Sequence, residues 1–102
     1  MENPTEHSNQ VHERHSLKIM GGFVRKWREK LGLTQEQFAP IAGFTRSYIT
    51  EIETGKRNIS FLNFVKLVQF LQVDSSELIK LFSELKKSKE KQRGQDQKWT
   101  DN

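Results

Sequence analysis

Three glycines divide the middle of the chain into short runs that each have the pattern of a helix. Gly32, Gly43 and Gly55 follow stretches in which apolar residues recur at the spacing of three and four that is typical of an amphipathic helix. A glycine at such a place favours the left-handed conformation that ends a helix. No segment shows the sustained alternation of apolar and polar residues expected of a half-buried strand. We therefore predict an all-α fold.

Side chains that can cap helices indicate where the predicted helices begin. Thr34 and Gln37 together form a capping-box pattern, and the hydroxyls of Thr45 and Ser60 can each cap a further helix. Pro40 lacks a backbone N–H, so the second helix should be short or bent. Together these signals predict five helices, at residues 18–31, 35–42, 46–54, 61–71 and 76–85.

The link between the second and third predicted helices is unusually short. Only Phe44 and Thr45 separate Gly43 from the third helix. Two helices joined by so short a turn cross steeply, and the second stands out from the body of the domain. A helix held in this way fits the major groove of B-DNA, which is about 12 Å wide. The turn therefore predicts a helix-turn-helix motif in the second and third helices.

The composition is compatible with a nucleic-acid partner. The chain has 17 Lys and Arg against 13 Asp and Glu, and its formal net charge of +4 favours a polyanionic partner without identifying it. It has no cysteine, which excludes a disulfide framework, a thiolate zinc site and a thiol nucleophile. No apolar run approaches the roughly 18 to 20 residues that a membrane span needs. We expect a cytoplasmic protein without a membrane partner.

The large apolar residues lie almost entirely in residues 17–85, which we predict to be the folded domain. Residues 1–16 contain too few apolar side chains to offset the entropy of ordering them, so we predict a disordered N-terminal arm. Residues 86–102 are rich in lysine and are predicted to form a basic C-terminal tail. That tail could bind additional phosphates or simply keep the protein soluble.

Residues 20–81 resemble the Cro and phage-repressor type of helix-turn-helix family, also called the XRE family. The segments that carry the resemblance read "REKLGLTQEQFA", "GFTRSYITEIETGKRN" and "VKLVQFLQV". It implies a five-helix, lambda-repressor-like domain whose partner is double-stranded DNA. Members of the family regulate transcription by binding operators, usually as homodimers on palindromic sites. Pro40 and Ile59 depart from the family pattern, but neither belongs to the face expected to meet DNA.

The resemblance also implies roles for individual residues. Arg46 could pair with guanine, while Glu51 could accept a hydrogen bond from cytosine or orient Arg46. Tyr48 could equally pack against the second helix. The predicted base-contacting residues are Arg46, Ser47, Thr50 and Glu51. The predicted phosphate-contacting residues are Gln35, Thr45, Tyr48, Lys56, Arg57 and Asn58. Arg28 and Glu53 match a family ion pair that joins the first helix to the recognition helix, and we expect them to have a structural role.

The fifth predicted helix carries an apolar stripe, and the fourth has Leu62, Val65 and Phe70 outside the face that it gives to the core. A domain of this size should not be able to bury both, and we expect pairing through these two helices. An exposed stripe of this kind indicates an interface. We therefore predict a dimer interface formed by Leu78, Leu81, Phe82 and Leu85. Such a dimer would place two recognition helices roughly 34 to 36 Å apart, one turn of DNA. The alternative is that the stripe packs under the first helix.

These observations predict a homodimeric, sequence-specific DNA-binding transcriptional regulator, of which phage repressors and restriction-modification controller proteins are two kinds. One alternative is an antitoxin that represses its own operon, with a toxin or RNA polymerase as a further partner. Another is a protein-interaction adaptor that binds DNA only non-specifically. His7, His12 and His15 lie in the predicted arm without a carboxylate to orient them, so we expect no metal and no cofactor. No triad or carboxylate pair is predicted, and we expect no enzymatic activity.

Overall fold

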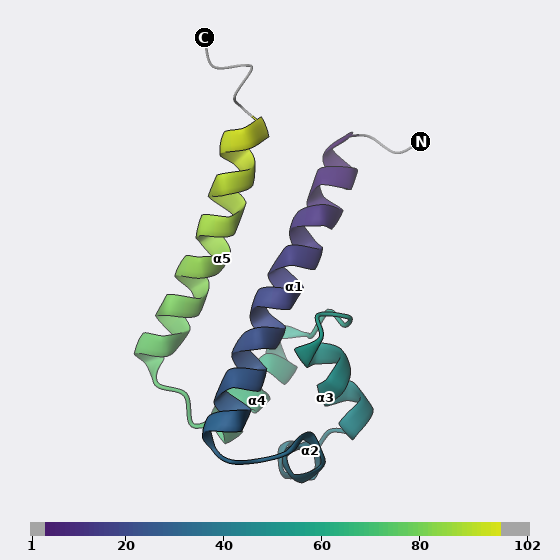
Figure 1. Ribbon diagram of the computed structural model, residues 1–102, viewed down its shortest axis with the longest axis vertical. Helices are drawn as coiled ribbons and strands as arrows, with labels where there is room; N and C mark the ends of the chain where they lie inside the picture. The colour runs from purple at the N-terminus through teal and green to yellow at the C-terminus, as the bar shows by residue number, and fades with distance from the viewer. Residues whose placement is uncertain (1–3, 97–102) are drawn as a thin grey trace.

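The computed structural model describes residues 4–96, and the side chains of residues 13–87. Its five helices are α1 (Pro4–Lys30), α2 (Gln35–Ala42), α3 (Arg46–Glu53), α4 (Phe61–Leu71) and α5 (Ser75–Asp96). No strand occurs among the described residues, and the prediction of an all-α fold with five helices is confirmed. The three short helices gather around the C-terminal half of α1, and the two long helices run side by side (Figure 1).

The core lies where α1, α2, α3 and α4 meet. Each of these helices contributes at least one side chain that solvent does not reach: Val24, Phe38, Ile49, Leu67 and Leu71. Burying one such side chain stabilises the fold by roughly 1.5 to 3 kcal/mol relative to leaving it exposed. The three-and-four spacing of the apolar residues therefore places the short helices in fixed positions around α1.

Local capping signals determine the ends of the short helices. Thr34 Oγ1 accepts a hydrogen bond from the backbone N–H of Gln37, and the Gln37 side chain accepts one from the backbone N–H of Thr34. Gly43 has a φ of 80°, the left-handed conformation expected of a residue that ends α2. Thr45 then caps α3 through the backbone N–H of Tyr48. The predicted steep link between α2 and α3 is thus formed by residues 43–45.

Pro40 lies inside α2 and on its exposed side. The helix has only 8 residues, as we predicted from the missing N–H. The carbonyl of Pro40 still accepts a hydrogen bond from the backbone N–H of Gly43, at 3.2 Å. The helix therefore continues past Pro40 as far as its Gly43 cap, and Phe38, Ala39 and Ala42 remain buried.

Gly21 allows α1 to lie directly against the C-terminal end of α3. A Cβ at this position would collide with the carbonyl oxygen of Ile52 and would lie 2.8 Å from that of Glu53. A Cβ on the neighbouring Gly22, in contrast, would meet nothing within 4 Å. One glycine of this pair is thus required by the packing of α1 on α3, and the other is not.

The predicted disordered arm is wrong for the part of it that the structure describes. α1 begins at Pro4, whereas we predicted its start at residue 18. Proline is tolerated in the first turn of a helix, and residues 5–20 contain no further proline and no glycine. A helix nucleated by the packed half of α1 can therefore propagate towards the N-terminus at little cost. Residues 1–3 lie outside the described residues.

The C-terminal segment differs from the prediction in the same way. We predicted that the last helix ends near residue 85, but α5 continues to Asp96. Most residues of this continuation are lysine, glutamate, glutamine or arginine, which are good helix formers, so the helix extends without a hydrophobic face. Residues 97–102 of the predicted tail lie outside the described residues.

The predicted dimer stripe is divided between two environments. Leu81 is only 3% exposed and is not available to a partner, whereas Leu78 and Leu85 are partly buried against the core. The long α5 runs beside α1, which is the arrangement expected by the alternative that the stripe packs under the first helix. Phe82 remains 51% exposed. Phe61 is also exposed, at the first position of α4.

Candidate DNA-binding surface

The outer face of α3 brings together the four predicted base-contacting residues. They line a shallow depression of about 430 Å³ and are Arg46, Ser47, Thr50 and Glu51. On a helix these positions share one face, because the second pair follows the first after about one turn. The opposite face of α3 is anchored by Ile49 and Ile52, both buried in the core. The exposed face therefore has a fixed orientation relative to the domain.

Both charged residues of this face already have partners within the chain. Arg46 Nη1 lies 2.8 Å from Glu36 Oε1, and Arg57 Nε lies 2.7 Å from Glu51 Oε1. Glu51 therefore pairs with Arg57 and does not orient Arg46. All four side chains are exposed, and ion pairs in that setting contribute only about 0 to 1 kcal/mol. Such pairs can be exchanged for contacts with DNA at small cost.

Arg28 and Glu53 form a buried ion pair that joins α1 to α3. Two nitrogens of Arg28 meet the two carboxylate oxygens of Glu53 at 2.6 Å and 2.9 Å, and a third donates to the carbonyl of Leu33. The side chains are only 8% and 2% exposed. The hydrogen bond to Glu53 raises the pKa of Arg28 above its ordinary value, and the opposing effect of burial is smaller. The pair therefore fixes the C-terminal end of α3.

Gln35 extends this network to α2, which the sequence did not indicate. Its side-chain nitrogen donates to Glu53 at 2.9 Å, and its side-chain oxygen accepts from the hydroxyl of Thr50 at 2.8 Å. The amide nitrogen of Gln35 has a second N–H, so the predicted phosphate contact stays a prediction. In this structure the Gln35 side chain connects the buried ion pair to the outer face of α3 and holds the Thr50 hydroxyl.

Tyr48 is partly buried, and the partners described for it lie in the link after α2, in α4 and in the loop after α3, and not in α2 itself. Its ring stacks on Phe44 with centroids 4.8 Å apart, and its hydroxyl accepts a hydrogen bond from the Asn63 side chain at 2.9 Å. The guanidinium of Arg57 lies over the ring, 5.1 Å from its centroid. Neither Phe44 nor Asn63 was predicted to contribute, since these contacts exist only once α3 meets the rest of the fold. Thr45 is occupied as the cap of α3.

The loop after α3 carries the remaining predicted phosphate contacts. Lys56, Arg57 and Asn58 are all exposed. The Asn58 side chain donates to Glu13 of α1 at 3.0 Å, a contact that the predicted disordered arm could not have provided. In the part of the chain that the structure describes, no group of three or more His, Cys, Asp or Glu residues could hold a metal ion. The side chains of His7 and His12 are outside that part.

Residues 24–78, more than half of the chain, match the family model described as "Helix-turn-helix". The chain belongs to the helix-turn-helix family. The match spans α2, α3 and α4 with the adjoining ends of α1 and α5, and it supports the predicted XRE type. This family consists of DNA-binding regulators and is not a class of enzymes. None of the described helices is long and apolar enough to cross a membrane.

Similar proteins from bacteria share this domain over most of their length. The chain is 41% identical to "Control protein C.MunI" from Mycoplasma sp over 70% of its own length and 95% of that protein. It is 34% identical to the "HTH-type transcriptional regulator y4dJ" of Sinorhizobium fredii, over 61% of this chain and 80% of the regulator. A solved structure, the restriction-modification controller protein C.AhdI from Aeromonas hydrophila, is similar with a TM-score of 0.59 and 37% identity, over 64% of this chain and 94% of that one. In these relatives, too, the helix-turn-helix domain accounts for most of the protein.

Proposed function

We propose that this protein is a transcriptional regulator of the controller type that binds a palindromic operator as a homodimer. The observation that carries the proposal is the exposed face of α3, where Arg46, Ser47, Thr50 and Glu51 surround one depression. Polar side chains on a helix that stands out from its domain suit the edges of base pairs in the major groove. The names of the C.MunI and C.AhdI relatives support the controller type.

In the proposed complex, base contacts and phosphate contacts have separate sources. Arg46 leaves Glu36 and donates two hydrogen bonds to guanine O6 and N7, and Glu51 accepts from cytosine N4. Lys56, Arg57 and Asn58 bind the phosphates next to the half-site, which positions α3 without reading sequence. The Arg28–Glu53 pair holds α3 in place so that little ordering is needed on binding. Regulation then follows from occupying the operator.

The proposed dimer interface consists of the apolar side chains that are exposed on α4 and α5. We define the α4–α5 apolar face by its exposed residues, which are Phe61, Leu62, Phe70, Ile79 and Phe82. Phe61 and Leu62 are each 73% exposed, and a large apolar surface in water indicates an interface. A twofold pairing through this face would present two copies of α3 to successive turns of DNA, roughly 34 to 36 Å apart.

Selection from a pool of random DNA duplexes at near-physiological salt tests this function. Sequencing of the retained duplexes should reveal an inverted repeat whose half-sites are about one helical turn apart. A variant with Arg46, Ser47 and Glu51 all changed to Ala provides the control and should retain duplexes without enriching the repeat. Retention by the wild-type protein without any enrichment would instead show a non-specific binder. No retention at all would favour a protein-interaction adaptor.

A further inference from the structure

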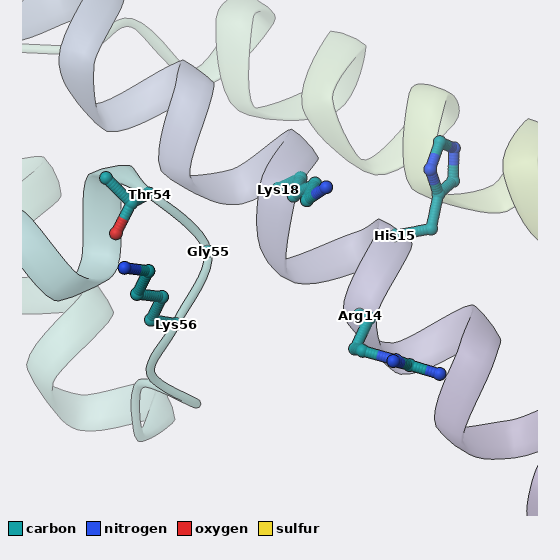
Figure 2. A pocket seen from close by; sticks show the side chains of 6 residues that line it. All are labelled: Arg14, His15, Lys18, Thr54, Gly55 and Lys56. Atoms are coloured by element: carbon teal, nitrogen blue, oxygen red, sulfur yellow. The ribbon is translucent and has the colours of Figure 1, made fainter.

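A second depression lies between α1 and the segment that follows α3. It has a volume of about 410 Å³ and is lined by Arg14, His15, Lys18, Thr54, Gly55 and Lys56. Figure 2 shows the three α1 residues on one side and the residues of the loop on the other. Three of the six lining residues are arginine or lysine, and no carboxylate is among the described residues of the lining. We call this depression the α1 cleft.

Contacts on both sides of Lys56 fasten the loop to α1. A Cβ on Gly55 would lie 2.8 Å from Lys18 Cγ and 3.1 Å from Lys18 Cα, so the loop backbone rests directly on the helix. Gly55 has a φ of 73°, which other residues adopt only with strain. On the other side of Lys56, the Asn58 side chain donates to Glu13. These two contacts hold the loop backbone at Lys56 against α1. In Figure 2 the Lys56 side chain extends towards Thr54 and the Arg14 side chain extends away from the loop, so their charged ends must turn inward to meet one anion.

The α1 cleft continues the surface that is proposed to read DNA. Thr54 follows Thr50 and Glu51 by one turn along the outer face of α3. Its hydroxyl donates to the backbone carbonyls of these same two residues. A DNA strand leaving the depression at Arg46 and Glu51 would therefore meet the α1 cleft at the far end of α3.

Backbone groups do not explain how an anion would be bound here. The C-terminal end of a helix carries partial negative charge, and the backbone N–H groups of Gly55 and Lys56 already donate to carbonyls of α3. An anion in the α1 cleft must therefore be held by the side chains of Lys56, Lys18 and Arg14. An alternative role for these cations is to offset the charge at the end of α3, for which one nearby cation would be enough.

We propose that the α1 cleft binds a phosphodiester of the DNA backbone beside the half-site, so that α1 extends the DNA contact beyond the bases that α3 reads. This inference rests on the proposed function. Arg14, His15 and Lys18 precede the residues that match the family model, whereas Thr54, Gly55 and Lys56 lie within them, so the long α1 adds its cations to a loop of the shared domain. A phosphate held by several cations in a cleft forms charge-assisted bonds and releases counterions.

The test compares two variants that remove the same charge. The first is Arg14→Gln with Lys18→Gln, in the α1 cleft. The control is Lys80→Gln with Lys87→Gln, on α5, where both lysines are exposed and periodicity places them on the side away from Leu81. Affinity is measured from about 50 to 200 mM salt on a random-sequence duplex of about 30 base pairs and on the duplex recovered by selection.

For the α1 cleft variant, we expect the slope of log affinity against log salt to flatten by about 0.9 for each phosphate that the protein no longer neutralises. Affinity at the lowest salt should fall roughly tenfold on both duplexes, as the removal of a charge-assisted hydrogen bond implies. The control variant should show a clearly smaller change, and the charge-conserving variant Arg14→Lys with Lys18→Arg should restore the slope. Equal slopes for the two glutamine variants would overturn the proposal.

Two further arms separate the outcomes. Inorganic pyrophosphate is titrated without DNA while the amide signal of Gly55 is followed by NMR. Saturation at micromolar pyrophosphate, with an unchanged slope of log DNA affinity against log salt in the α1 cleft variant, would identify a free-anion site and overturn the DNA claim.

Thermal unfolding of each variant checks the fold. Because the substituted side chains are exposed, the Tm should be unchanged. If the wild-type protein enriches an operator and the α1 cleft variant has the same affinity and salt slope as the wild-type protein, only this inference fails. If nothing is enriched, the proposed function fails independently.

Discussion

At the scale of single residues, Arg46 and Lys56 should affect DNA binding in different ways. Arg46 lies in the depression on α3, whereas Lys56 lies in the loop and contributes to the α1 cleft. We expect Arg46→Ala to relax discrimination at one base pair of each half-site by about 1 to 3 kcal/mol. Lys56→Ala should weaken binding to all sequences alike. Affinities for the operator and its single-base-pair variants measure this, and equal losses on every sequence from both changes would contradict base reading by Arg46.

Glu53 and Glu51 both pair with an arginine, but their burial differs. Glu53→Gln should lower the free energy of unfolding by about 3 to 5 kcal/mol, because it leaves the Arg28 guanidinium buried beside a neutral partner. Glu51→Gln breaks only an exposed pair with Arg57 and should cost less than about 1 kcal/mol. Urea denaturation of the two variants measures the difference. Similar decreases in the free energy of unfolding would mean that burial does not determine how much these ion pairs stabilise the fold.

Residue roles could be predicted from the sequence only where they depend on position along one helix. The outer face of α3 follows from helical periodicity, and the structure brings Arg46, Ser47, Thr50 and Glu51 together as expected. The partners of this face could not be predicted in the same way. Glu36 beside Arg46 and Gln35 between Thr50 and Glu53 depend on how α2 crosses α3. Their side chains carry no local signal of these contacts.

At the scale of elements, the two adjacent glycines of α1 offer a matched pair for testing how the helix packs on α3. Alanine normally stabilises a helix interior relative to glycine by roughly 0.5 to 1 kcal/mol, and Gly22→Ala should do so because its Cβ has open space. Gly21→Ala places a Cβ against the carbonyls of Ile52 and Glu53, and overpacking should destabilise the fold by about 1 to 3 kcal/mol. Thermal unfolding of both variants gives the sign of each change. Stabilisation by both would show that α1 does not rest on the end of α3 as described.

The short helices were predictable and the long ones were not, for a physical reason. α2, α3 and α4 begin at caps and end near residues with positive φ, and both are local features of the sequence. The extensions of α1 and α5 carry no stop signal and no apolar stripe of their own. Whether such segments are helical depends on propagation from the packed half of the helix. The burial of Leu81 was missed for a related reason, because it follows from the course of α5 beside α1.

At the scale of the whole molecule, the proposed function assigns DNA binding and pairing to different parts of the surface. The outer face of α3 and the loop after it bear the polar and basic side chains, whereas the α4–α5 apolar face bears exposed phenylalanine, leucine and isoleucine. A palindromic operator requires both, since a twofold axis must relate the two copies of α3. Dimerisation and operator binding should therefore be linked, so that loss of one weakens the other.

The proposed dimer interface can be tested by substituting Phe82, with a substitution of the equally exposed Ile41 as the control. Both side chains are 51% exposed, but Phe82 lies on the α4–α5 apolar face and Ile41 lies on α2. Phe82→Glu should convert the dimer to a monomer. Each copy would contribute one carboxylate, and the symmetric interface would have to bury both without a partner charge. Ile41→Glu should leave the mass measured by sedimentation equilibrium unchanged.

Operator binding by the Phe82→Glu and Ile41→Glu variants provides a second measurement. A monomer that retains an intact α3 should bind a single half-site as the wild-type protein does, but it should lose the additional affinity for the complete palindrome. That gain arises because the second half-site is bound from within the same assembly. Dimers of unchanged stability in Phe82→Glu would rule out Phe82 as a contact and move the interface elsewhere. A wild-type protein that stays monomeric both free and on the palindrome would refute the symmetric regulator itself.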